Sequence, residues 1–337
     1  MVAEPLLEVK DLKVHFPTED GLVKAVDGIS FSVSSGETLG VVGESGSGKS
    51  VGFLTVMGLV TSKQAIIEGQ VIFQGQDLLT LPQDEMRNIR GAKMGMVFQD
   101  PMSSLHPFYR VGDQIGEAVR THQKVSKKEA AEMAVDMLKR VGIPRPDERA
   151  RQYPHEYSGG MRQRAMIAMS LVLNPDLLIA DEPTTALDVT VQAQILDLID
   201  RLREEFNAAV VIITHDLGVV AEHCDDIQVM YAGRIVETGD AKDIYYEAHH
   251  PYTWGLLQSI ARMDVATDRL RPIKGLPPSL IQVPPGCAFN PRCPYVMDIC
   301  KKERPELIPS NGHHASACHL SLAEKERIFH EDVVATS

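Results

Sequence analysis

The chain has 337 residues, of which 44% are hydrophobic and 24% charged, and its formal net charge at pH 7 is −12. This length accommodates two domains, or one large domain with an appendage, and the acidic balance argues against a large nucleic-acid footprint. No apolar stretch approaches the ~20 residues of a membrane-spanning helix, and residues 1–5 lack the features of a signal peptide. We therefore expect a cytosolic chain that contacts a membrane only through a partner.

Apolar patterning predicts a series of strands, some alternating and some continuously apolar as in buried parallel sheets. These strands are expected at residues 7–16, 29–33, 38–42, 66–73, 94–98, 177–180 and 209–213. Two further strands, 227–231 and 234–237, flank Ala232-Gly233 and suggest a hairpin.

Between these strands the pattern becomes helical. Helices are expected at residues 50–60, 161–173 and 189–206, and a capping box at Ser126-Lys-Lys-Glu129 opens another that runs to about Arg140. The helix-rich stretch, about residues 101–173, is interpreted as an inserted helical subdomain. Beyond about Pro251 prolines recur and periodicity disappears, which predicts a separate, loop-rich tail.

Residues 43–50 form a complete phosphate-binding loop, Gly-Glu-Ser-Gly-Ser-Gly-Lys-Ser, between a predicted strand and a predicted helix. The glycines allow the backbone to approach phosphate oxygens, and the amides at the helix start favour anions. Lys49 is expected to reach the β- and γ-phosphates, and the Ser50 hydroxyl to bind Mg²⁺. The expected nucleotide contacts of the loop are Gly43, Ser45, Gly46, Ser47, Gly48, Lys49 and Ser50.

Polar residues follow three of the predicted strands. Asp181 and Glu182 follow 177–180, Gln99 follows 94–98, and His215 follows 209–213. Carboxylates at the carboxyl ends of parallel strands face a ligand crevice, so Asp181 suits a Mg²⁺ contact through water and Glu182 could polarise an attacking water. Gln99 could contact the γ-phosphate or Mg²⁺, and His215 the γ-phosphate.

Ser158-Gly159-Gly160 precedes the helix at 161–173, where exposed amides can form a second anion site. Because the chain already has one phosphate loop, this second site makes sense if it acts on a nucleotide bound to another subunit.

With these motifs in this order, the chain resembles the nucleotide-binding subunit of ABC transporters over about residues 6–250. Pro183-Thr-Thr-Ala-Leu-Asp188 is similar to the D-loop, with Asp188 at a dimer contact, and Tyr157-Ser-Gly-Gly-Met161 is similar to the signature motif, although Tyr157 and Met161 replace the usual Leu and Gln. The resemblance implies an α/β P-loop NTPase with a RecA-like mixed sheet, an antiparallel β subdomain and the helical insert. It also implies that Phe16 stacks on adenine and that two subunits sandwich two ATP molecules.

Several longer segments are similar to the oligopeptide/dipeptide importer branch. They are Tyr153-Pro-His-Glu-Tyr-Ser-Gly-Gly-Met-Arg-Gln-Arg164, Met230-Tyr-Ala-Gly233, His250-Pro-Tyr-Thr253 and Pro291-Arg-Cys-Pro294. The branch implies an ATPase that energises peptide import at the cytoplasmic face of the inner or plasma membrane. Its implied partners are a second, paralogous ATPase, two transmembrane permease subunits and an extracytoplasmic substrate-binding protein. The branch also serves nickel and oligosaccharides, so these solutes stay as alternatives.

Four of the five cysteines, Cys287, Cys293, Cys300 and Cys318, crowd into the loop-rich C-terminal extension, residues 251–337, outside the nucleotide-binding domain of residues 1–250. Four thiolates suffice for zinc or for a [4Fe–4S] cluster. Structural zinc sites favour C-x₂₋₄-C pairs, whereas these spacings are longer, and the branch resemblance also points to [4Fe–4S]; zinc stays the alternative. We expect Cys224 to be a buried or half-buried thiol, and His313, His314 and His319 to lie on the surface.

A different class of function, a soluble ABC-type ATPase acting on DNA or ribosomes, is the main rival hypothesis. Members of that class carry coiled coils or zinc insertions before the signature motif, or fuse two cassettes. Here the interval between phosphate loop and signature lacks sustained heptads, and the chain holds one cassette. The importer hypothesis is therefore favoured.

Overall fold

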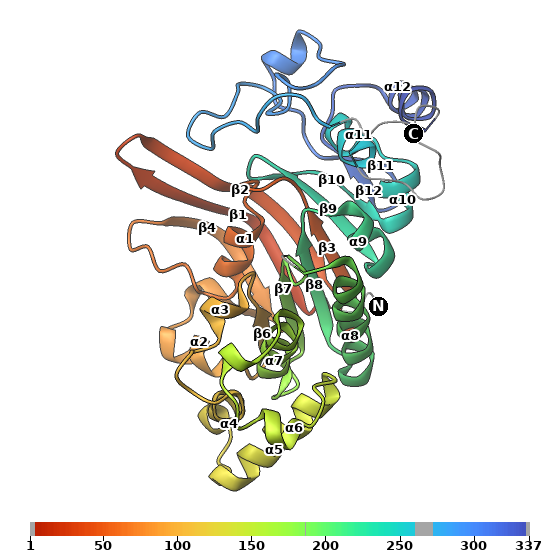
Figure 1. Cartoon of the computed structure of the whole chain (residues 1–337). Coiled ribbons are helices and arrows are strands. Elements are labelled where there is room, and N and C mark those ends of the chain that lie inside the picture. Colours follow the sequence, from red (N-terminus) through yellow and green to blue (C-terminus); the bar gives the residue numbers. More distant parts are fainter. Residues whose placement is uncertain (1–3, 186, 260–271, 335–337) are drawn as a thin grey trace. The chain divides into compact units, whose positions relative to one another are not determined.

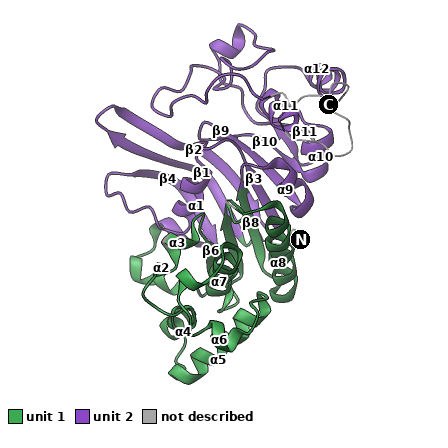
Figure 2. Ribbon diagram, viewed as in Figure 1, with its two compact units in different colours: residues 1–6, 34–37, 80–213 green, residues 7–33, 38–79, 214–337 purple. Residues whose placement is uncertain are grey.

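The computed structural model describes residues 4–185, 187–259 and 272–334 (Figure 1). The chain divides into two compact units (Figure 2). Unit 1 consists of residues 1–6, 34–37 and 80–213, and unit 2 of residues 7–33, 38–79 and 214–337. Unit 2 therefore combines an early segment with the last third of the chain, and unit 1 is formed mainly by the middle.

Unit 2 contains an antiparallel sheet in the order β2-β1-β4-β5. Its strands are β1 (Leu7–Thr18), β2 (Gly21–Val33), β4 (Ile66–Phe73) and β5 (Gln76–Asp77). The buried residues of β1 change parity from Leu7 and Val9 to Leu12 and Val14. A register shift at this point, with Asp11 at φ 45°, inserts the extra residue that returns the apolar side chains to one face.

Five more strands of unit 2 lie in the order β11-β12-β10-β9-β3. They are β3 (Thr38–Val42), β9 (Asp226–Tyr231), β10 (Arg234–Asp240), β11 (Ile308–Asn311) and β12 (His314–Ser316). β3 and β9 run parallel, whereas β9 and β10 form the expected hairpin. Its turn, Ala232-Gly233, has positive φ at both residues, as a type I′ hairpin turn requires.

The helices of unit 2 are α1 (Lys49–Val56), α9 (Leu217–His223), α10 (Ala241–Tyr246), α11 (Pro251–Gln258) and α12 (Leu322–Ile328). α9 packs so closely on β3 that a Cβ on Gly40 would lie 2.8 Å from Val220 and 2.9 Å from the sulfur of Cys224. Cys224 is buried, as expected from the sequence. α1 is shorter than the expected helix 50–60 because Gly58 takes a left-handed conformation and ends it.

Unit 1 contains three parallel strands, β6 (Met94–Val97), β7 (Leu177–Asp181) and β8 (Ala209–Thr214), with β7 between the other two. Every residue of these strands is buried, which explains their continuous apolar sequence. α8 (Val189–Phe206) occupies the range expected for it, with buried residues at helical spacing such as Ile195, Leu198 and Leu202.

The remaining helices of unit 1 belong to its helix-rich stretch, apart from α2, which precedes it. They are α2 (Gln83–Ile89), α3 (Pro101–Ser104), α4 (Val111–His122), α5 (Lys127–Arg140), α6 (Pro146–Arg149) and α7 (Gly159–Leu171). Both bonds of the predicted capping box are present at the start of α5, between Ser126 and Glu129. α4 and α5 pack on each other, and both pack on α7.

The segment after residue 250 contains more regular structure than the sequence, which suggested a loop-rich tail, had indicated. It contains α11, α12 and the short strands β11 and β12, and β12 pairs with β10 through Glu237–Ser316 and Thr238–Ala315. These strands of four and three residues are too short to give a periodic signal. The compact units thus do not divide the chain near residue 250, and the expected domain boundary stays a prediction. No helix among the described residues is long and apolar enough to cross a membrane.

Candidate functional site

The phosphate-loop motif links β3 to α1 within unit 2, in the strand–loop–helix context that the sequence predicted. Two of its glycines have positive φ, 79° at Gly46 and 101° at Gly48. Gly48 also packs against the backbone, since a Cβ there would lie 2.1 Å from the Ala25 carbonyl oxygen. A Cβ on Gly46, by contrast, would meet no atom within 4 Å. The loop therefore packs tightly at Gly48 and has an open face at Gly46.

Lys49 is buried at the first position of α1, and its ammonium group turns back into the loop. Its Nζ donates to the carbonyl oxygens of Gly43 at 2.7 Å and Glu44 at 3.1 Å. Ser45 and Gly46 are exposed, and Ser50 is half-buried. A cation and the first amides of a helix are thus gathered around one short loop, an arrangement suited to an anion with several oxygens.

Two other predicted site residues also belong to unit 2. Phe16 lies near the end of β1, paired with Val23 of β2, and its side chain is half-buried. His215 follows β8 and is exposed. Each residue thus has an accessible ring, a requirement for stacking in the first case and for polar contact in the second.

In unit 1, Glu182 and Gln99 meet at the carboxyl ends of β7 and β6. Asp181 is the buried last residue of β7. Glu182 follows it with φ 47°, and its backbone amide donates to the Ile213 carbonyl at 2.8 Å. One Glu182 oxygen, Oε2, accepts from Gln99 Nε2 at 2.7 Å and from the Thr185 hydroxyl at 2.9 Å. The sequence predicted Gln99 and Glu182 as site residues but did not predict the bond from Thr185.

The Ser-Gly-Gly motif forms the start of α7, with Ser158 as N-cap accepting from the Met161 amide at 3.3 Å. Ser158 and Gly159 are exposed, and a Cβ on Gly160 would lie 2.9 Å from Val191. Tyr157 is buried, which raises the pKa of its hydroxyl to about 12, and the hydroxyl donates to the Arg149 carbonyl. The buried Tyr157 therefore fixes the backbone directly before Ser158.

Asp188, the expected dimer contact, is exposed and caps α8 by accepting from the Val191 amide at 3.0 Å. Ala186, within the same expected D-loop, lies outside the described residues.

The four clustered cysteines line one small pocket of unit 2 together with His250, Phe289 and Leu320. Burial, together with the neighbouring cysteines, raises the pKa of the Cys293 thiol to about 12 and that of the Cys318 thiol to about 11. A cationic group would reverse this effect by stabilising the thiolates. The donor set therefore fits a metal centre.

The spacing of the four sulfurs bears on the size of that centre. Among the described residues, no three cysteine sulfurs lie within 4.8 Å of one another. Thiolates on one tetrahedral zinc ion would be separated by only ~3.8 Å, given Zn–S bonds of ~2.3 Å. A four-iron cluster is larger than a single ion and suits more widely separated thiolates.

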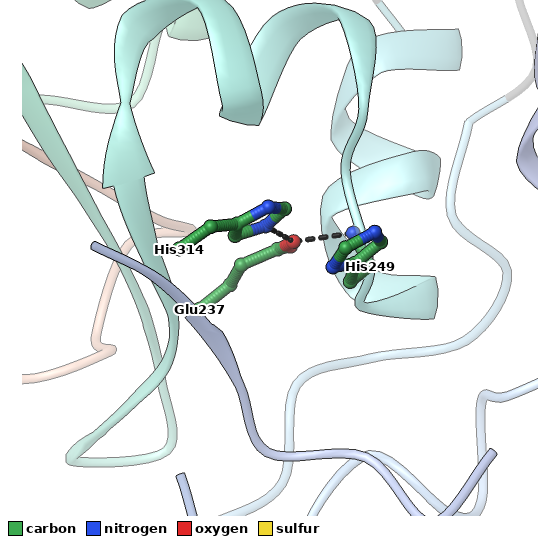
Figure 3. Close-up of side chains that lie close together, drawn as sticks. All are labelled: Glu237, His249 and His314. Atoms are coloured by element: carbon green, nitrogen blue, oxygen red, sulfur yellow. Dashed lines mark hydrogen bonds and ion pairs between the residues drawn. The ribbon is translucent and has the colours of Figure 1, made fainter. Parts of the chain in front are cut away.

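A second polar cluster in unit 2 corrects one prediction. His314 is buried, not on the surface as expected, whereas His313 is exposed and His319 is partly exposed. His314 Nε2 lies 2.9 Å from Oε1 of the fully buried Glu237, which also accepts from the backbone amide of His249 (Figure 3). The other oxygen of Glu237 accepts from the His250 amide at 3.1 Å. Burial of the β12 hairpin strand against β10 therefore takes His314 inside.

Glu237, His249 and His314 bring ligand atoms together, yet their geometry favours hydrogen bonding over metal binding. The two imidazole rings stack with centroids 4.1 Å apart and planes 7° apart. Ring lone pairs lie in the ring planes, so those of stacked rings do not converge on one ion. Burial also lowers the pKa of His249 to about 4, helped by His314 and Lys325, so this ring is neutral. The cluster is a hydrogen-bonded connection between β10, β12 and the start of α11.

Comparison with known proteins places these observations in a family. A family model described as ABC transporter matches residues 26–185, and one described as Oligopeptide/dipeptide transporter, C-terminal region matches residues 236–300. The dipeptide transport ATP-binding protein DppD of Bacillus subtilis is 51% identical over 318 residues, 94% of this chain and 95% of the relative. The oligopeptide transport ATP-binding protein OppD of Escherichia coli is 52% identical over 303 residues, 90% of both chains.

Solved structures agree with the fold. The ATP-binding cassette MJ0796, in a dimeric post-hydrolysis state bound to ADP and Pi, has a TM-score of 0.63 at 27% identity and covers 70% of this chain and 98% of its own. The cbiO1 protein of Clostridium perfringens has a TM-score of 0.61 at 28% identity, covering 73% of this chain and 92% of its own. The chain thus has the fold of an ABC ATPase cassette, a P-loop NTPase with mixed α/β sheets. The chain belongs to the ABC transporter family, among the ATP-binding subunits of oligopeptide and dipeptide transporters.

Proposed function

We propose that this chain binds and hydrolyses ATP to energise the import of di- or oligopeptides through a membrane ABC transporter. The observation that carries the proposal is the phosphate loop, in which Lys49 is buried against the loop carbonyls and Gly46 leaves an open face. Relatives of about 50% identity that carry transport ATP-binding names support the peptide class of solute.

The roles of the loop residues follow from their places in unit 2. The ring of Phe16 would stack on adenine, which gives binding with little base selectivity. The amides from Ser45 to Ser50 would donate to phosphate oxygens, and Lys49 would exchange its bonds to the loop carbonyls for the β- and γ-phosphates. His215 would donate to the γ-phosphate.

Hydrolysis would depend on the carboxylate network of unit 1. Glu182, oriented by Gln99 and Thr185, would accept a proton from the attacking water. Ser50, Gln99 and Asp181 are the residues that would hold Mg²⁺, directly or through water. When bound, this ion neutralises charge on the transferred phosphoryl group. The bond from Gln99 would also report the state of the site to the helical insert that follows it.

A second ATPase subunit would complete each site. Ser158, Gly159 and Gly160 would act on a nucleotide held by the partner, because Ser158 and Gly159 are exposed at the start of α7. Asp188 would lie at the subunit contact, for which its exposure at the start of α8 leaves room. We propose a heterodimer with a paralogous chain.

The membrane partners would be two transmembrane permease subunits fed by an extracytoplasmic substrate-binding protein, with this chain peripheral at the cytoplasmic face of the inner or plasma membrane. Large apolar side chains support a docking surface on unit 1 soon after Gln99. Met102 is 48%, Phe108 81% and Tyr109 59% exposed. Large exposed apolar side chains gathered in one short segment of the chain suit an interaction site. Nucleic acid is not among the proposed partners.

The four cysteines of unit 2 would hold a [4Fe–4S] cluster, with zinc as the alternative. The convergence of Cys287, Cys293, Cys300 and Cys318 on one pocket supports a metal centre. Among the described residues no three of these sulfurs lie within 4.8 Å of one another, which favours the larger group. The cluster would supply structural cross-linking of the extension. Anaerobic purification of the full chain with iron, sulfide and zinc analysis tests this: iron and sulfide in equal amounts, with visible absorption lost in Cys293→Ser, is expected, whereas stoichiometric zinc would establish the alternative.

The transport proposal is tested by uptake in cells that lack the chain. Complementation should restore uptake of labelled di- and oligopeptides, and Glu182→Gln should not. Restored uptake of nickel or an oligosaccharide instead would reassign the solute. Copurification from membranes should recover two multi-spanning proteins and a second ATPase; recovery with ribosomes or DNA-bound proteins would refute the transport role.

A further inference from the structure

The second residue of the phosphate loop, Glu44, is held by side chains that lie far from the motif in sequence. Its carboxylate accepts two bonds from the guanidinium of Arg292, Nη1 to Oε2 at 2.6 Å and Nη2 to Oε1 at 2.9 Å. Its backbone amide donates to the hydroxyl oxygen of Tyr252 at 2.8 Å. Tyr252 lies in α11 and Arg292 lies one residue before Cys293, so both partners come from the segment after residue 250.

The side chain of Arg292 is also held in place by contacts other than Glu44. Its side chain is 4% exposed, whereas that of Glu44 is 26% exposed. The guanidinium lies 5.9 Å from the ring centre of Tyr231 and 5.8 Å from that of Phe289, and its Nε donates to the Lys274 carbonyl. The bidentate contact with Glu44 raises the pKa of Arg292, so the group is charged at any physiological pH. Planar, bidentate pairs of this kind are the strong and directional ones.

Glu44 in turn forms part of the loop that Lys49 closes. The Glu44 carbonyl accepts from the Ser47 amide at 3.2 Å and from Lys49 Nζ at 3.1 Å. Fixing Glu44 at its amide and at its carboxylate therefore fixes the turn from which the loop amides project. Arg292 also neutralises a carboxylate that would otherwise repel the phosphates of a nucleotide in the same loop.

The position of Arg292 is itself set by the cysteine-bearing segment. The amides of Arg292 and Cys293 both donate to the Phe289 carbonyl at 3.0 Å, and the Cys287 amide donates to the Cys300 carbonyl at 2.8 Å. The turn that presents the arginine thus includes one of the four cysteines of the pocket and follows another.

We propose that Arg292 is a positioning residue for the phosphate loop, so that the C-terminal extension sets the affinity of the nucleotide site. The inference rests on the proposed ATP-binding function and adds a contribution from outside the motif. Because such coupling is reciprocal, nucleotide bound in the loop stabilises the turn around Arg292 by the same factor.

The test is binding of a fluorescent ATP analogue with Mg²⁺ to the full-length chain. Arg292→Gln should weaken binding on the order of tenfold or more, because Glu44 keeps its charge and loses its partner. The affinity of Arg292→Lys for the analogue should lie between those of Arg292→Gln and the parent, since lysine keeps the positive charge but cannot form the bidentate contact. Glu44→Gln combined with Arg292→Gln should bind more tightly than Arg292→Gln alone, because the unpaired carboxylate is gone.

Arg304→Gln is the matched control. Arg304 belongs to the same extension, is 48% exposed and, in the part of the chain that the structure describes, pairs with Asp27 at 3.4 Å and not with the loop. Its loss should leave affinity unchanged. Parent-like binding by Arg292→Gln, or a double variant no better than Arg292→Gln, would overturn the inference.

Two further measurements distinguish a positioning role of Arg292 from misfolding of a variant and from failure of the proposed ATP binding. Hydrogen exchange of the Arg292 and Cys293 amides in the unaltered chain should slow when the analogue binds, and unchanged exchange would count against the coupling. Lys49→Gln should lose binding whatever the role of Arg292. If the unaltered chain bound no nucleotide, the proposed function would fail. If the parent and Arg292→Gln bound the analogue equally well and only Lys49→Gln lost binding, the inference about Arg292 would fail and the proposed function would stand.

Discussion

Replacement of Glu182 by Gln tests the proposed chemistry most directly, because it changes one charge and hardly any volume. Glu182 Oε2 accepts from Gln99 and from Thr185, at 2.7 Å and 2.9 Å. An amide oxygen can still accept both of these bonds but cannot accept a proton from water at neutral pH. Loss of a general base lowers turnover by about 10²- to 10⁴-fold, which corresponds to about 2.7 to 5.4 kcal/mol at ~1.36 kcal/mol per factor of ten.

The assay combines steady-state phosphate release, with the partner subunits present, and equilibrium binding of ATP. Glu182→Gln should bind ATP as the parent does and release phosphate at the reduced rate. Thr185→Val provides the graded comparison, since it removes one positioning bond worth about 1.5 to 3 kcal/mol at most and keeps the carboxylate. Turnover of Glu182→Gln within about threefold of the parent, under conditions where the ~10²-fold loss was resolvable, would refute the role of Glu182.

Three more predictions concern the loop and the buried histidines. Lys49→Gln should abolish measurable binding of ATP in calorimetry, because it removes the buried ammonium that closes the loop. Gly48→Ala should lower the free energy of unfolding by at least ~2 kcal/mol, since its Cβ would meet the Ala25 carbonyl, whereas Gly46→Ala, with open space around it, should cost about 1 kcal/mol in denaturant titrations. The lowered pKa of His249, about 4 against 6.5 when unfolded, means that its neutral form contributes stability that is complete above pH 6.5 and is lost as the pH falls toward 4. His249→Asn should flatten the fall of unfolding free energy in that window, and the exposed His313→Asn should not.

The elements nearest the phosphate loop were predictable because their signals are local. The loop requires a strand before it and a helix after it, and both are present as β3 and α1. The continuous apolar runs of β7 and β8 and the helical periodicity of α8 likewise depend on neighbours only a few residues apart. Where a local signal was overridden, as at Gly58, a single left-handed residue ended the helix early.

Long-range pairing left no such signal. Arg292 and Glu44 are 248 residues apart, and nothing around either residue marks it as the partner of the other. Burial of His314 depends on β12 pairing with β10, and a strand of three residues has no periodicity to detect. The carboxylate of Glu182 could be singled out from its strand end, yet its hydrogen bond to Thr185 depends on a turn whose course the sequence does not specify.

The interleaving of the two units has a consequence for the order of folding during synthesis. Most of unit 1, residues 80–213, is continuous, so its partners all become available together. Unit 2 needs residues 7–33, 38–79 and 214–337, and the Lys24 amide donates to the Leu280 carbonyl across more than 250 intervening positions. β10 also stays an uncovered edge until β12 is made, and uncovered edges invite pairing with other chains. The phosphate loop, although it is translated early, therefore belongs to the part of the molecule that completes its structure last.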